Sequence, residues 1–243
     1  MDSIRTINNK KIEFRYNKVL SYLEKSINER VNKLLTQRPA GNFEPSLPLP
    51  LYERFEGSTA NTEWLLTQII FPEGEVIFQY SDDERLNTIT GELYRKDLNA
   101  QKGVALRRIL INNKTGNTIK NLSLNYSYFE SSRPNKNYQD YRLKLTEIYD
   151  NLQNSSYSFV YNEDMPIPAR NSNNDDYWGY INNTSGTEET SNIPRIVNTQ
   201  YVSGEVTMPN DKSRNRETNP QYSQLGVLNK ITYPTKGSKK IVL

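Results

Sequence analysis

The chain has 243 residues, with 31 Lys and Arg side chains against 28 Asp and Glu, which leaves a net charge of +3. It contains no Cys and no His, and this excludes disulfides, thiol nucleophiles, zinc–thiolate sites and every Ser-His-Asp arrangement. The balanced charge argues against a nucleic-acid partner, which requires a concentrated basic face. We expect no cofactor and no metal. A hydrolase built on two carboxylates is the enzyme class that this composition still permits.

One local pattern recurs along the chain. An apolar strand that ends near Ile is followed by a short polar turn, and a second strand then ends in aromatic-x-Tyr or a close variant. Four copies occupy residues 4–16, 65–80, 106–126 and 143–161. The first strand and the turn of a fifth copy occupy residues 228–237. Asn, Pro and Gly between the strands favour turn conformations. The sequence therefore predicts a series of antiparallel hairpins.

Alternation with a period of two residues places Ile12, Phe14 and Tyr16 on one face of a strand, and Phe78 and Tyr80 on one face of another. An isolated hairpin is only marginally stable in water, so the hairpins must stack on one another. We predict a mainly β fold in which antiparallel hairpins form one extended curved sheet over residues 1–243. The alternative is an ordinary antiparallel domain whose hairpins resemble one another by chance.

Two stretches interrupt this pattern. Residues 18–36 carry apolar side chains at steps of three and four, which predicts one amphipathic helix docked on the sheet. Pro39 to Pro50 follow as an extended, proline-rich connector, with a ligand for a proline-binding module as the alternative. We therefore expect an insertion over residues 18–50. No export signal pattern opens the sequence, and we interpret the chain as a piece of a longer protein.

The second interruption is a long polar loop region over residues 162–220, which contains the best local candidate for a site. Two acids and three aromatic side chains lie together there, at Asp175, Asp176, Tyr177, Trp178 and Tyr180. In one interpretation they bind a glycan or a surface protein, with rings stacking on the ligand and acids accepting hydrogen bonds. In the other they anchor the loop, with Trp178 buried and Asp176 accepting bonds from backbone amides.

One stretch in the last third of the chain reads Arg216-Glu-Thr-Asn-Pro220-Gln-Tyr222, followed by Gly226-Val-Leu228-Asn-Lys230-Ile231-Thr-Tyr233-Pro234-Thr, and an earlier stretch reads Asp176-Tyr-Trp178-Gly179-Tyr180. Both resemble stretches of large RHS/YD-repeat proteins of the Bacteroidetes type. The hairpin ends Leu124-Asn-Tyr126 and Phe159-Val-Tyr161 fit the same pattern. Tyr177 stands where the family has His, and Lys236 stands where it has Gly.

The resemblance implies a function that the composition does not show. RHS/YD proteins wind many hairpins into a β-shell that encloses toxin cargo, as in polymorphic toxins, or displays a contact surface. The resemblance thus implies a secreted or cell-surface scaffold rather than an enzyme. Its partners would be the remainder of a larger YD-repeat chain or another β-sheet edge. In this interpretation Tyr16, Tyr80, Tyr126 and Tyr161 close successive hairpins.

Overall fold

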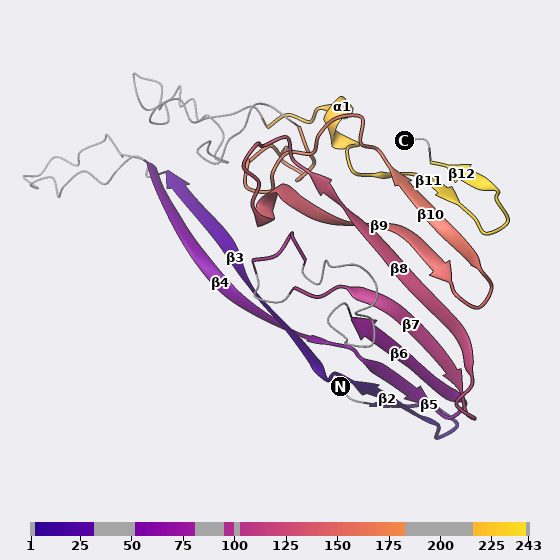
Figure 1. Ribbon diagram of the computed structural model, residues 1–243. Coiled ribbons are helices and arrows are strands. Elements are labelled where there is room, and N and C mark those ends of the chain that lie inside the picture. Colours follow the sequence, from indigo (N-terminus) through magenta and orange to yellow (C-terminus); the bar gives the residue numbers. More distant parts are fainter. Residues whose placement is uncertain (1–2, 32–51, 81–94, 100–102, 183–215, 242–243) are drawn as a thin grey trace, which may run out of the picture. The chain divides into compact units, whose positions relative to one another are not determined.

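The computed structural model describes residues 3–31, 52–80, 95–99, 103–182 and 216–241. Ten strands form one antiparallel sheet in the order β1-β2-β5-β6-β7-β8-β9-β10-β11-β12, and β3 and β4 form a separate two-stranded sheet (Figure 1). The strands are β1 Ser3–Arg5, β2 Lys11–Arg15, β3 Lys18–Val31, β4 Tyr52–Leu65, β5 Gln68–Phe71, β6 Gly74–Tyr80, β7 Leu106–Asn113, β8 Thr118–Glu130, β9 Tyr141–Asp150, β10 Ser155–Tyr161, β11 Leu228–Thr232 and β12 Ser238–Lys240. Two short helices complete the described elements, the 3-10 helix η2 Tyr138–Asp140 and the α-helix α1 Pro220–Ser223.

Every hairpin that the sequence predicts is an antiparallel pair of neighbouring strands in the large sheet. Residues with positive φ lie in four of the five turns, at Asn9 (57°), Gly116 (82°), Asn154 (50°) and Lys236 (66°). Asn and Gly reach this region of φ at low cost, which is why the polar turns of the sequence could be recognised. The prediction of a mainly β, antiparallel hairpin sheet is confirmed.

The helix predicted for residues 18–36 is wrong over the part that the structure describes, because Lys18–Val31 is the strand β3. Val19, Leu23 and Ile27 follow one another at steps of four, and such a step is shared by a helix face and by one face of a strand. Pairing with β4 decides between the two, as in the bond from Tyr22 Oη to Glu63 Oε1 at 2.8 Å. The proline-rich connector at 39–50 lies outside the described residues.

The described chain divides into two compact units. The first comprises residues 1–24, 60–167 and 225–243 and contains the whole ten-stranded sheet. The second comprises residues 25–59 and 168–224, and so contains the outer part of the β3–β4 ribbon together with most of the predicted polar loop region. The candidate site residues all belong to this second unit. No described helix is long and apolar enough to cross a membrane.

The junctions between successive hairpins share one local geometry. At three of them the register shifts by one residue immediately before a Tyr of the second strand, and this Tyr then pairs with a Leu of the next hairpin. The three pairs are Tyr80 with Leu106, Tyr126 with Leu145, and Tyr161 with Leu228. A β-bulge of this kind bends a strand and redirects a side chain. The hairpins therefore repeat in register as well as in sequence.

Two of the junction tyrosines also bond, through their hydroxyl groups, to the chain segment on the other side of their own strand. Tyr80 Oη donates to the carbonyl oxygen of Leu66 at 2.9 Å, and Tyr161 Oη donates to that of Leu145 at 2.8 Å. Burial raises the pKa of both phenols, so they remain protonated donors at neutral pH. Tyr161 thus contacts both strands that flank β10, whereas Tyr80 contacts β7 and the residues just before β5.

We expect Tyr161→Phe to lower the free energy of unfolding by about 1 kcal/mol, because it removes a hydrogen bond from a half-buried carbonyl. Tyr157→Phe is the matched control, since that ring lies on the same strand but is 43% exposed. Urea unfolding curves of the two variants measure the difference. Equal midpoints would contradict a structural role for the Tyr161 hydroxyl.

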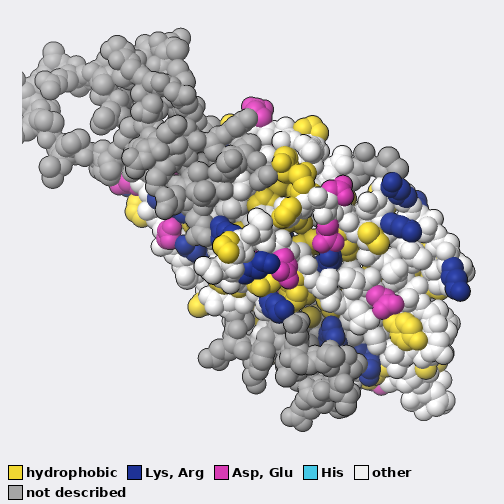
Figure 2. Space-filling model, turned by 45° about the horizontal axis from the view of Figure 1, so that its top comes forward, with side chains coloured by type: hydrophobic (Ala, Val, Ile, Leu, Met, Phe, Trp, Pro, Cys, Tyr) yellow, Lys and Arg dark blue, Asp and Glu magenta, His cyan; other side chains and the backbone are white. Residues whose placement is uncertain are grey.

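Most apolar side chains of the central strands lie on one face of the sheet, while Ile77 and Leu110 pair with each other on the opposite face. Cross-strand partners connect Phe14, Ile69, Val76 and Ile111 in one row, and Phe78, Ile109 and Leu122 in the next. Among all residues of the ten strands, only Gln79, Leu124, Phe129 and Asp150 are fully buried. Hydrophobic side chains accordingly remain visible at the surface of the described residues (Figure 2).

Candidate functional site

The predicted cluster lies in a tight loop that Asp176 holds closed. The Asp176 carboxylate is fully buried and accepts bonds from the backbone N–H groups of Trp178 at 2.8 Å and Tyr180 at 2.9 Å. Its other oxygen accepts a bond from Thr218 Oγ1 at 2.7 Å. Gly179 supplies the bend with a φ of 88°, a conformation that side chains with a Cβ rarely adopt.

A second set of contacts holds this loop to the segment that begins at Arg216. The Arg216 guanidinium donates to the carbonyl oxygen of Asp176 at 2.8 Å and to Asp175 Oδ2 at 3.3 Å. It also lies over the Tyr177 ring, 5.0 Å from the ring centroid. The fully buried Asn182 bonds through its side-chain amide to the carbonyl oxygen of Glu217 at 3.4 Å. The loop is therefore braced by residues about forty positions further along the chain.

The Asp176 carboxylate is ionised at neutral pH. Burial acts to raise its pKa, but the bonds from Thr218 and from the amides of Tyr180, Trp178 and Gly179 outweigh burial and hold the pKa below its ordinary value. Because Asp176 has no exposed surface, its carboxylate accepts these bonds and directs no lone pair to solvent. Asp176 acts as a positioning residue of the loop.

The three aromatic side chains of the loop point outward. Trp178 is 82% exposed, Tyr180 is 58% exposed and Tyr177 is 54% exposed. The expectation that an anchored loop would bury Trp178 is therefore wrong, while the expected capping of backbone amides by Asp176 is what the structure shows. The loop combines a fixed backbone with rings that contact water.

Sequence reasoning missed the side chains that brace the loop. Arg216 and Thr218 lie in the stretch that resembles RHS/YD proteins, but no local spacing links either of them to Asp176. The repeated Asn and Asp before Gly179 indicate a tight turn. No comparable signal reports a contact across forty residues, so only the folded chain reveals it.

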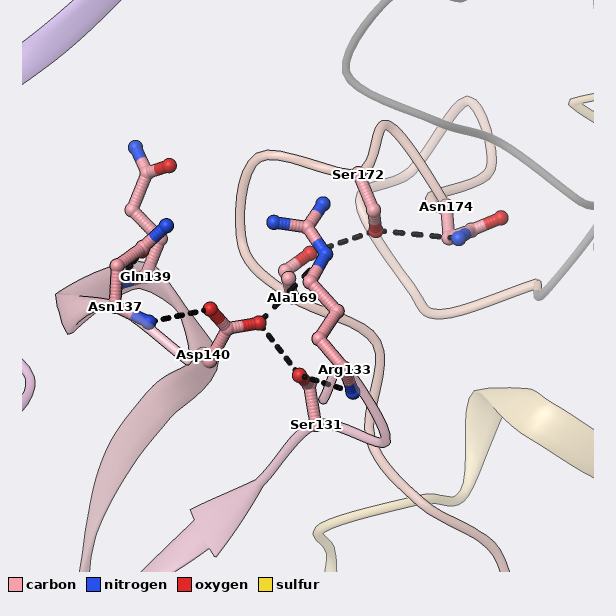
Figure 3. Close-up of polar contacts among 8 residues, drawn as sticks. All are labelled: Ser131, Arg133, Asn137, Gln139, Asp140, Ala169, Ser172 and Asn174. Carbon is pink, nitrogen blue, oxygen red and sulfur yellow. Dashed lines mark hydrogen bonds and ion pairs between the residues drawn. The ribbon is translucent and has the colours of Figure 1, made fainter. Parts of the chain in front are cut away.

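A second buried carboxylate lies in the first unit, at the start of β9. Asp140 is fully buried and accepts bonds from the backbone N–H of Asn137 at 2.8 Å and from Ser131 Oγ at 2.5 Å, with Arg133 Nε 3.7 Å away (Figure 3). Burial acts to raise its pKa, but the Asn137 amide, Ser131 and Arg133 together lower it. The Asn137 side chain also accepts from the amide of Gln139, and Asn137 and Asp140 together form a capping box at the start of η2. This cluster fixes the loop between β8 and β9.

The carboxylates of Asp176 and Asp140 accept hydrogen bonds that hold their loops in place. Neither Asp176 nor Asp140 has exposed surface, so neither can contact a substrate unless its loop opens. Within the described residues there is no group of three acidic side chains placed to hold a metal ion. The exposed rings of Tyr177, Trp178 and Tyr180 are the part of this site that a ligand could reach. Comparisons with protein-family models, with curated proteins and with solved structures found no match to this chain.

Proposed function

We propose that this chain is a non-catalytic structural segment of a larger exported or cell-surface β-scaffold of the RHS/YD-repeat type. The single observation that carries the proposal is the recurring junction, in which a bulge precedes Tyr and the Tyr pairs with Leu at three successive hairpins. A geometry that repeats at each junction can be extended by further hairpins of the same kind. The residue resemblance to RHS/YD proteins supports the same conclusion. In this proposal the sheet is part of a shell that encloses cargo or displays a contact surface.

The apolar face of the sheet supports the proposal independently. A domain that folds by itself buries the apolar face of a sheet against a second layer. Here Phe78, Ile109 and Leu122 form a continuous row on one face, and each remains partly exposed. The proposed larger protein would cover this face or use it as the wall of an enclosure.

The test of the scaffold proposal compares the two faces of the central strand β7. We expect the isolated chain to bind the dye anilinonaphthalene sulfonate, and Ile109→Thr to reduce the dye fluorescence markedly. Leu110→Thr, on the opposite face of the same strand, should reduce it less, because the apolar pair Leu110–Ile77 is flanked there by the polar residues Gln68 and Asn121. Urea unfolding of both variants controls for stability. Absence of dye binding by the wild-type chain would argue that the face needs no cover and would overturn the proposal.

A second candidate function is recognition of a glycan or a surface protein by the loop of Tyr177, Trp178 and Tyr180. The observation that favours it is the 82% exposure of Trp178 on a backbone that Asp176 holds in place. An exposed indole ring on a fixed loop offers a flat apolar surface at low conformational cost. Asp175, at the edge of the same loop, accepts from Arg216 and can also accept from a ligand.

The second candidate is tested by affinity electrophoresis through gels that contain soluble polysaccharides, with binding to intact cells as a parallel assay. We expect Trp178→Ala to abolish retardation and cell binding. Trp64→Ala is the matched control, because Trp64 is 66% exposed but lies on β4 rather than on this loop. If both variants behave like the wild-type protein, the loop has no such binding role.

A further inference from the structure

The exposed rings of the Trp178 loop form an open surface rather than a pocket. Asp175 pairs with Ile181 in an antiparallel bridge, so the chain doubles back and carries Tyr177, Trp178 and Tyr180 at or next to the turn. Each of these three rings is more than half exposed. A site for a small molecule covers most of the surface of its ligand, and rings as exposed as these cannot do so. The surface therefore suits an extended ligand that lies across it.

The size of this surface argues against a protein partner. An aromatic side chain buries about 150–250 Å² when it is covered completely, so the exposed parts of the three rings offer roughly 400 Å² in total. A stable protein interface buries about 800 Å² on each partner, and the rings provide only about half of that area. The same area is large enough to cover the faces of a few sugar rings.

The charge around the rings argues against an anionic ligand. Residues 175–182 and 216–218, which form and brace the loop, contain three acids and one base. The Asp176 carboxylate stays ionised, since its hydrogen-bond donors hold its pKa below the ordinary value. A negative surface repels phosphate groups and acidic polysaccharides. The loop therefore favours an uncharged ligand.

Arg216 fixes one acid and one ring of the loop at the same time. Its guanidinium donates to Asp175 Oδ2 at 3.3 Å and lies 5.0 Å from the centroid of the Tyr177 ring. One face of Tyr177 is thus covered, and Trp178 is left as the most exposed flat ring of the loop. The Asp175 side chain is 37% exposed, so a ligand hydroxyl can reach it. A flat ring and an acceptor on one fixed turn match the apolar face and the polar rim of a sugar.

We propose that the Trp178 loop binds a neutral β-linked glucan. Every ring substituent of such a glycan is equatorial, so each sugar ring presents flat C–H faces. One C–H face stacks on the Trp178 indole, and a hydroxyl at the rim of the ring donates to Asp175. Acidic glycans with the same backbone are excluded by the negative charge of the loop. The inference rests on the second candidate function and adds the chemical class of the ligand.

The test uses Trp178 as its own reporter, because the chain has two Trp residues and Trp64→Phe leaves Trp178 as the remaining one. This protein is titrated with hydroxyethyl cellulose, a neutral β-glucan, and with carboxymethyl cellulose, which has the same backbone with acidic substituents. We expect the neutral polymer to shift the Trp178 emission to shorter wavelength and to bind roughly tenfold more tightly than the acidic polymer at about 50 mM salt. Raising the salt to about 300 mM should narrow this difference, since salt screens exposed charges.

Asp175→Asn separates ligand recognition from a structural role. The substitution keeps an acceptor oxygen and removes one negative charge from the loop. We expect the acidic polymer to bind several-fold more tightly to this variant, whereas a structural defect would weaken the binding of both polymers. The neutral polymer should bind within about threefold of its original affinity, because a partly exposed ion pair with Arg216 contributes little. Glu73→Gln, which removes an exposed acid from the turn between β5 and β6, is the matched control and should leave both affinities unchanged.

Equal binding of the two polymers, no response to the neutral polymer, or an unchanged preference in Asp175→Asn would overturn the proposal. Binding to cells that depends on Trp178 and survives enzymatic removal of their glycans would identify a protein as the ligand. That result would overturn the neutral glucan and leave the second candidate function standing. If Trp178→Ala changes no binding at all, both fall. The dye experiment at Ile109 is independent of these outcomes.

Discussion

Asp176→Ala should release the loop that carries Trp178 and accelerate hydrogen exchange of the Trp178 and Tyr180 amides by roughly 30- to 160-fold. Both amides donate to Asp176 Oδ1, and Thr218 donates to its other oxygen. Removing a charged acceptor from donors of this kind costs about 2–3 kcal/mol. Because the loop opens locally, this loss of free energy should appear in full as faster exchange of the two amides. Amide exchange followed by NMR measures it residue by residue.

Asp175→Ala is the control for this experiment. Asp175 is adjacent in sequence, but its carboxylate is partly exposed and bonds to Arg216 at 3.3 Å, whereas both amides donate to Asp176. Its removal should leave the exchange of Trp178 and Tyr180 within a few-fold of the wild-type rate. Unchanged exchange in Asp176→Ala would show that another contact closes the loop.

The same carboxylate makes the loop sensitive to acid. Its pKa in the folded protein lies below the ordinary value, so its stabilising contribution is complete above the unfolded pKa of about 3.9 and is lost as pH falls through the folded value. The pKa values of Asp140 and Asp150 are lowered as well, so global acid unfolding reports all three carboxylates together. Asp176→Asn should abolish the acid-induced opening of this loop without abolishing global acid unfolding. Trp178 fluorescence, measured in a Trp64→Phe background, reports the loop.

Gly74→Ala should lower the free energy of unfolding by about 3 kcal/mol, at the upper end of the range for overpacked sites. A Cβ added at Gly74 would lie 2.1 Å from the carbonyl oxygen of Asn112 and 3.1 Å from the Asn113 Cα. These are backbone atoms of the adjacent strand β7, so they cannot rotate away as a side chain would. The clash is relieved only if β6 and β7 move apart at this end of their pairing.

Gly237→Ala is the matched control in the turn between β11 and β12. Its nearest neighbour to an added Cβ is Thr235 Oγ1 at 3.7 Å, an ordinary contact. The change should alter the free energy of unfolding by less than about 0.5 kcal/mol. Urea unfolding of both variants, analysed with a common m-value, measures the two changes in the free energy of unfolding. Comparable stability of Gly74→Ala and the wild-type protein would mean that the two strands separate easily at this point.

The local pattern determined most of the strands. Alternation of apolar residues, as at Ile12 and Phe14, and turn residues such as Asn9 and Gly116 act within a few positions of the chain, so they can be read from the sequence directly. The composition also determined the absence of thiol and imidazole chemistry. The cluster of acids and rings at 175–180 was visible for the same reason, since its members are adjacent.

Interactions between distant segments decided the rest. The four-residue steps of Val19, Leu23 and Ile27 fit a helix and a strand equally, and pairing with β4 selected the strand. The exposure of Trp178 follows from Asp176 turning inward toward Thr218, forty-two residues later, a contact that no local spacing encodes. The bulges before Tyr80, Tyr126 and Tyr161 arise only when two hairpins meet. The Tyr-ending hairpin is thus a property of the sequence, but its register against the next hairpin is a property of the sheet.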